Sequence, residues 1–128
     1  MAEDMLPFSF QIRSTARHSI GAIEGLRSGT YSPDRSGLPE SFAELSSIVA
    51  GAERALAALD PAELESLTER EVLFIAGERR LAFTGQDFLL SFAQPNFYFH
   101  ATTAYDILRW KGLPIGKRDF SGQLRVKG

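Results

Sequence analysis

The stretch FYFHATTAYDILRWKG, residues 97–112, is the part of the sequence that decides the fold. At 100° per residue, one set of side chains shares a face and predicts a helix packed on a core: Phe97, Ala101, Ala104, Tyr105 and Leu108. Phe99 and Trp110 fall on the opposite side, so the helix is apolar on two sides. A helix of this kind is either central in its domain or has a partner outside it.

Signals on both sides of this stretch set the limits of the helix, which we expect over about residues 85–111. Thr84 is a suitable N-cap, and Gly112 is the expected C-terminal cap. Pro95 lies inside the segment and should kink or split the helix.

Two further long helices are predicted upstream. The first begins near Asp4 and runs to about Arg27. The second begins at Ser41, which forms a capping box with Glu44. Its apolar face is continuous and comprises Phe42, Leu45, Ile48, Val49, Ala52, Ala55, Leu56 and Leu59. A short helix over 61–66 should follow, because Asp60-Pro61 is a cap followed by proline.

Residues 71–83, EVLFIAGERRLAF, have a different pattern. Four consecutive β-forming residues precede a glycine-containing turn and an alternating segment, which predicts a small β-hairpin. A buried irregular loop is the alternative. The chain, 1–128, is expected to form a single domain with a flexible tail at 117–128.

The composition limits the partners and the chemistry. Charged residues make up 23% of the chain and the formal net charge is −2, with no cluster of Lys and Arg that would bind a phosphate backbone. We therefore expect no nucleic-acid partner. No apolar run has membrane-spanning length and no signal peptide is visible, so a cytoplasmic protein without membrane contact is expected. Cysteine is absent, which excludes disulfides and thiolate chemistry.

His100 is the main candidate for a functional residue. It lies at the edge of the apolar face and can be a packed boundary side chain, a metal ligand or a general base. A helical metal site needs a second ligand three or four residues on, but these positions hold Thr103 and Ala104. His18 is expected to be a surface side chain.

Tyr98 and Tyr105 are the other candidates for ligand contacts. They could donate hydrogen bonds into a cavity near His100, although buried tyrosines also do so structurally.

The segment LAFTGQDFLLSFAQPNFYFHATTAYDILRWKGLPIGKRDFSG, residues 81–122, closely resembles a bacterial family, domain of unknown function nineteen ninety-three. The stretch DMLPFSFQI, residues 4–12, resembles the second helix of the same family, so the resemblance covers nearly the whole chain. It implies membership of the DinB/YfiT-like superfamily of up-and-down four-helix bundles. The expected fold class is therefore all-α, with three long helices, the first bundle helix missing, and a small hairpin at about 71–83.

The resemblance also bears on metal binding. Several superfamily relatives are metal-dependent hydrolases or thiol transferases that hold nickel or zinc with three histidines. His100 matches the first histidine of the fourth-helix pair, Ala104 stands at the second, and Met5 to Gln11 holds no histidine. We therefore expect no cofactor, and the alternative is a divalent transition metal held through His100.

Only Met1 to Glu3 precede the segment that resembles the second helix. With one wall of the bundle missing, the other helices should expose an apolar groove. Either the chain is truncated, or a second copy covers the gap, and the expected arrangement is then a homodimer in which each copy covers the groove of the other.

Two function hypotheses follow. The first is a metal-free homo-oligomeric binding or structural protein that holds an apolar small molecule near His100, Tyr98 and Tyr105. The second is a divergent metal-dependent enzyme, of hydrolase or thiol-transferase type, that uses His100. The sequence leaves the question of an enzyme open.

Overall fold

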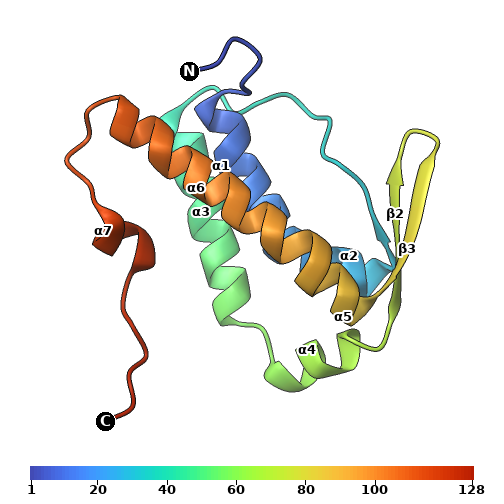
Figure 1. Cartoon of the computed structure of the whole chain (residues 1–128). Helices are drawn as coiled ribbons and strands as arrows, with labels where there is room; N and C mark the ends of the chain where they lie inside the picture. Colours follow the sequence, from blue (N-terminus) through green and yellow to red (C-terminus); the bar gives the residue numbers. More distant parts are fainter.

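Three helices make up one end of the molecule, and the computed structural model describes all residues, 1–128. They are α1 (Phe8–Arg17), α3 (Phe42–Ala57) and α6 (Gln94–Trp110). Helix α1 contacts both of the others, and α6 runs across it (Figure 1). This contact between α1 and α6 positions the candidate site.

The expectation of an all-α fold is wrong, because the other end of the molecule holds a three-stranded mixed sheet. The predicted hairpin is present as β2 (Glu71–Ala76) and β3 (Arg79–Thr84), which pair antiparallel. A third strand, β1 (Thr30–Tyr31), pairs parallel with β2 and makes the order β1-β2-β3. The pattern missed β1 because a two-residue strand has no periodicity of its own and forms only where its partner strand is already in place.

The hairpin follows from its local sequence. Val72 and Phe74 are the buried positions of β2 and alternate with more exposed ones, as one buried face requires. Gly77 has φ 62°, a conformation that suits glycine at the first central position of a two-residue hairpin turn.

The first predicted helix is wrong as a single element, since it is interrupted at His18 and Ser19. Helix α1 ends at Arg17, and α2 runs from Ile20 to Ser28. The Ser19 hydroxyl donates to the carbonyl of Ala16, and its backbone N–H donates to the same oxygen at 3.2 Å. Serine side chains compete with the helical backbone in this way, which here tightens the turn and ends α1.

The caps predicted for α3 and α4 are confirmed. The Glu44 N–H donates to the Ser41 hydroxyl oxygen at 3.2 Å, and the Ala62 N–H donates to the Asp60 carboxylate at 2.9 Å. Helix α4 runs from Pro61 to Leu67, one residue beyond the predicted end.

The last long helix runs without a break from Gly85 to Trp110, but its turn before Pro95 is π-helical. A short α5 (Gly85–Asp87) leads into a π-helical segment, η1 (Phe88–Ala93), and then into α6. Proline has no N–H to give and clashes with the carbonyl four residues earlier, so a wider turn before it relieves the clash. The Asn96 side chain donates to the Phe92 carbonyl at 2.7 Å and satisfies one acceptor in this segment.

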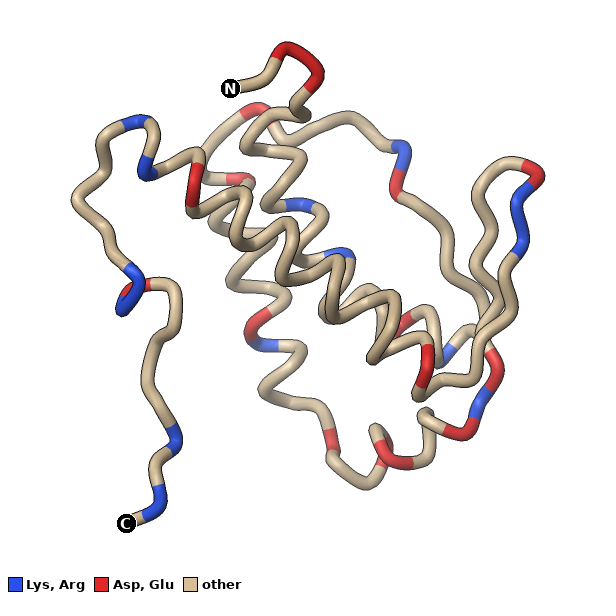
Figure 2. Tube along the Cα trace, viewed as in Figure 1, with Lys and Arg blue, Asp and Glu red and all other residues tan.

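The chain ends in a short helix, α7 (Lys117–Ser121), followed by residues 122–128 without secondary structure. Acidic residues gather around α4 and the turn that follows it (Figure 2). None of the helices combines the length and the apolar composition needed to cross a membrane.

The hydrophobic core lies between α2, the sheet and η1, away from α3. Its buried members are Ala22, Ile23, Leu26, Tyr31, Leu67, Val72, Phe74, Phe88 and Ala93. Helix α3 contributes only Leu45 to the buried set, so most of its apolar face is not covered by the core.

Gly85 tests how tightly the start of α5 packs against the end of α4. A Cβ added there would lie 2.2 Å from the carbonyl oxygen of Leu67, which is backbone and cannot swing aside. We expect Gly85→Ala to lower the free energy of unfolding by about 2 kcal/mol or more, measured by urea denaturation. The matched control is Gly51→Ala in α3, where nothing lies within 4 Å and where the free energy should rise by about 1 kcal/mol. Equal effects of the two substitutions would contradict this packing.

Candidate functional site

His100 lies where α6 crosses α1, and its ring is held by Gln11. The Gln11 side chain is 4% exposed, and its Nε2 donates to the Leu6 carbonyl at 3.0 Å. Its Oε1 therefore faces His100 and lies 2.7 Å from Nδ1. Because an amide oxygen only accepts, Nδ1 carries the proton, and Nε2 of His100 is left as a hydrogen-bond acceptor.

His18 lies beside His100, although the sequence predicted a surface side chain. The two imidazole rings stack with centroids 5.6 Å apart and planes 11° apart. Nδ1 of His18 lies 3.2 Å from the Tyr31 hydroxyl, which itself donates to the Arg17 carbonyl at 3.3 Å or to the imidazole. The two half-buried imidazoles thus come from segments far apart in the sequence.

Burial keeps both imidazoles neutral. Desolvation, followed by the neighbouring His100 and Arg17, lowers the pKa of His18 to about 4. Desolvation also lowers the pKa of His100. Burial raises the pKa of Tyr31 to about 12, so its hydroxyl stays protonated. At neutral pH the ring nitrogens can therefore both donate and accept.

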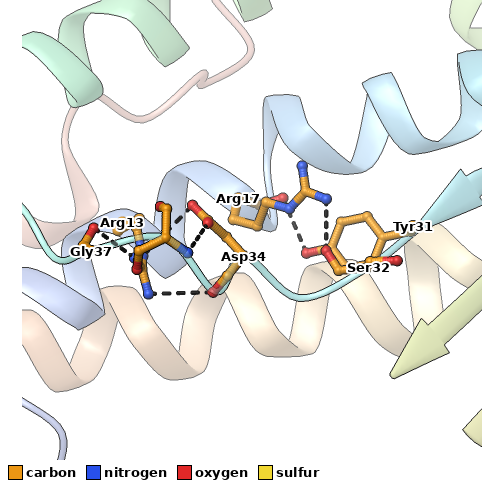
Figure 3. Close-up of polar contacts among 7 residues, drawn as sticks. Arg13, Arg17, Tyr31, Ser32, Asp34 and Gly37 are labelled. Atoms are coloured by element: carbon orange, nitrogen blue, oxygen red, sulfur yellow. Dashed lines mark hydrogen bonds and ion pairs between the residues drawn. The ribbon is translucent and has the colours of Figure 1, made fainter. Parts of the chain in front are cut away.

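Two arginines of α1 hold the loop after β1 over the site (Figure 3). Arg17 donates to the Ser32 carbonyl at 2.7 Å, and Arg13 donates to the Gly37 carbonyl at 3.1 Å. The Arg17 guanidinium carbon also lies 4.5 Å from the centre of the Tyr31 ring. This cation–π contact offsets the burial of its Nε, which has no hydrogen-bond partner.

Asp34 is occupied within the same loop. Its carboxylate accepts from the Ser36 N–H at 2.8 Å and lies 3.9 Å from Nε of Arg13. The hydrogen bonds from Ser36, and then the nearby Arg13, hold the pKa of Asp34 below its usual value. The carboxylate is thus ionised and fixes the loop.

These side chains surround a pocket of about 310 Å³ between α1, α6 and the loop. Aromatic rings and polar groups both line it: Phe10, Arg13, Ser14, Arg17, His18, Tyr31, Pro33, Asp34, Phe74, Phe92, Asn96 and His100. The pocket combines an apolar wall with neutral imidazoles and a cationic rim.

The structure places the two other candidate residues elsewhere. Tyr98 is 53% exposed on α6, and Tyr105 packs against Phe120 with ring centroids 5.6 Å apart. Neither of them lines the pocket beside His100. Their role as ligand contacts remains a prediction without support from this geometry.

The site does not supply the three-histidine donor set of the metal-binding superfamily members. His18 and His100 offer two imidazoles, and no group of three or more His, Cys, Asp or Glu side chains is placed to hold a metal ion. Ala104, at the position of the second fourth-helix ligand, is 4% exposed and has no donor atom. The residues present therefore do not fit that metal centre.

Sequence reasoning missed His18 and Gln11, but a signal for both exists. Gln11, Ser14 and His18 are spaced three and four residues apart, which puts them on one stripe of a helix. Gln11 and Ser14 are the two buried polar residues of the chain, and this stripe faces α6. A polar stripe that reaches a buried position indicates a partner on the facing element.

Comparisons with known proteins agree with this architecture. A family model described as "Domain of unknown function (DUF1993)" matches residues 1–121. The chain is similar to the crystal structure of a DinB family member protein from Shewanella denitrificans, with 26% sequence identity and a TM-score of 0.80. The match covers 100% of this chain and 72% of that chain. A search of curated proteins found no match. The chain belongs to the DUF1993 family and shares its fold with a DinB family member.

Proposed function

We propose that this protein binds a small organic molecule in the pocket between α1, α6 and the loop after β1. The ligand has a flat apolar body and a polar end that carries a hydrogen-bond donor. The pocket lies within a single chain, so ligand binding does not depend on an oligomer.

The dimensions and walls of the pocket support this proposal. About 310 Å³ lies at the lower end of the range of small-molecule sites. Phe10, Phe74 and Phe92 supply the apolar wall. Aromatic faces favour flat ligands, because stacked rings contribute beyond the area they bury.

The observation that carries the proposal is the fixed tautomer of His100. Gln11, itself buried and held by the Leu6 carbonyl, keeps the proton on Nδ1. Such a supporting contact orients a functional imidazole and leaves Nε2 free to accept a hydrogen bond. With His18 also neutral, the recognition is by hydrogen bonds rather than by charge at the imidazoles.

A divergent metal-dependent enzyme of the DinB-like group is the second candidate. The observation that favours it is the stacked pair of His18 and His100, because neutral imidazoles are good ligands for zinc and nickel. The two candidates differ in what they expect from His100→Ala when purified protein is dialysed against zinc or nickel and then analysed for metal. If the protein is a metal-dependent enzyme, the wild type should hold one metal ion per chain and the His100→Ala variant none. If it is a metal-free binding protein, the metal content should be the same in both.

Screening of flat heteroaromatic fragments by ¹H–¹⁵N NMR tests the proposed pocket. We expect binding fragments to shift the amide signals of His18 and His100. Replacing His100 by Leu should weaken their binding by about tenfold, since one hydrogen bond to the ligand is lost.

The matched control for this screen is Tyr98→Leu. Tyr98 is on the same helix but 53% exposed and outside the pocket, so this variant should bind like the wild type. Fragments that bind equally well to the His100 variant, or that shift signals only elsewhere, would rule out this pocket as the ligand site.

The neutral His18 makes stability depend on pH in a defined window. Its folded pKa of about 4 lies below the ordinary value of 6.5, so the unfolded chain binds the proton more tightly. Stability should therefore be lost as pH falls from about 6.5 to about 4. The loss is about 1–2 kcal/mol once solvent screening of this half-buried ring is allowed for.

Urea denaturation of wild type and His18→Gln between pH 4 and 7 measures this effect. The glutamine cannot titrate, so the difference between the two proteins isolates His18 from the carboxylates. Parallel pH profiles would show that His18 is not desolvated as described.

A further inference from the structure

The protein exposes more surface than a folded monomer of its mass. Its accessible surface is 8968 Å², whereas a folded chain of 14.1 kDa is expected to expose about 6,700 Å². The extended residues 122–128 contribute to the difference. The total excess of roughly 2,200 Å², of which this end of the chain is a part, is about twice the 1,000 Å² or so per subunit at which obligate dimer interfaces begin.

Three exposed apolar side chains share one face of α3. Phe42, Val49 and Leu56 are 75%, 46% and 38% exposed. They are seven residues apart, and Leu45 and Ala52 lie between them at the intervening positions of the same stripe. Apolar residues that alternate at intervals of three and four positions are typical of a helix that packs lengthwise against a second helix. Between Glu44 and Glu53, α3 carries no charge that would oppose such packing (Figure 2).

An apolar groove continues this stripe onto α1 and α6. It has a volume of about 420 Å³ and is lined mainly by apolar side chains. Phe8 and Ile12 come from α1 and Leu108 from α6, beside Phe42 and Val49 of α3. The stripe and the groove together form one face, called here the α3 face.

We propose that the α3 face binds a second copy of this chain, with the two α3 helices antiparallel about a twofold axis near Val49. This arrangement puts Val49 beside the partner subunit's Val49 and Phe42 beside the partner subunit's Leu56. Glu53 is then level with the partner subunit's Leu45, and Glu44 with the partner subunit's Arg54, so no two acids are level with each other. The same patch serves both subunits, as a twofold interface requires.

The other exposed aromatic residues are weaker candidates for this interface. Trp110 is 61% exposed, but the Lys111 ammonium lies 4.6 Å from its ring and covers one face. Phe99, 64% exposed, already packs against the edge of His100. Residues of α3 do not line the pocket at His100, so the dimer leaves that pocket accessible.

Light scattering after gel filtration gives the first test. The wild type should have twice the 14.1 kDa mass of one chain, and Val49→Glu should have the mass of one chain. A buried carboxylate at the axis would weaken association at least about a hundredfold. Val49 is exposed in the single chain, so the variant should keep the wild-type circular dichroism spectrum.

Cross-linking gives a second test that does not depend on a disruptive variant. The chain has no cysteine, so Val49→Cys introduces one thiol per subunit. If the axis passes near residue 49, oxidation should convert nearly all of this variant to a covalent dimer, because a disulfide needs Cβ atoms about 4 Å apart. Trp110→Cys, at a position more exposed than Val49 but outside the α3 face, is the control and should cross-link poorly.

Two results would overturn the proposal. One is a wild-type mass equal to a single chain, which would leave the α3 face to a different partner. The other is a dimer that survives Val49→Glu and dissociates in Trp110→Glu, which would place the interface on the outer side of α6.

Discussion

The packing of Tyr31 joins the two ends of the molecule, and both the core and the pocket depend on it. The side chain is 2% exposed. Its ring lies 5.2 Å from that of Phe88 and 6.3 Å from that of Phe74, which anchors β1 in the core. Its hydroxyl lies 3.2 Å from Nδ1 of His18, at the end of α1. One residue thus links the sheet to the helices, and the floor of the pocket is also part of the core.

The parts of the fold that were predicted correctly depend on residues close together in the sequence. Ser41 and Glu44 form a cap within one helical turn, and Asp60 caps a helix that begins with proline. The hairpin follows from β-forming residues on both sides of Gly77. Each of these patterns acts through local hydrogen bonds or backbone preference, so it can be read without knowing the rest of the fold.

The parts that were missed depend on contacts between distant segments. The strand β1 exists because Leu73 donates to the Gly29 carbonyl at 3.0 Å and because Tyr31 is buried. The position of His18 depends on where α1 ends and on how α6 crosses it. When the segment is treated as one uninterrupted helix, its apolar residues define the buried face. A polar residue outside that face is then predicted to be exposed to solvent. Only the crossing of the two helices shows that His18 and His100 share a pocket.

The chain shares its fold with a DinB family member, but its residues do not supply the three-histidine donor set that the resemblance implied. At the position expected for a second helical ligand, this chain buries the methyl group of Ala104. At His100 it supplies a glutamine contact that fixes a neutral ring. The proposed recognition of a small molecule therefore rests on the residues at this helix crossing and not on the fold, in keeping with the general rule that function resides in sites rather than folds.

The π-helical segment Phe88–Ala93 has a consequence for how this family can change over time. It holds an additional residue in its wide turn, between the core anchor Phe88 and the pocket residue His100. Loss of that residue would close the wide turn to an ordinary α-helical turn and leave the faces of the flanking helices nearly unchanged, whereas loss of a residue between Pro95 and His100 would turn His100 by about 100° away from Gln11. The π-helical turn is therefore the place in this part of the chain where a change of length disturbs the pairing of His100 with Gln11 least.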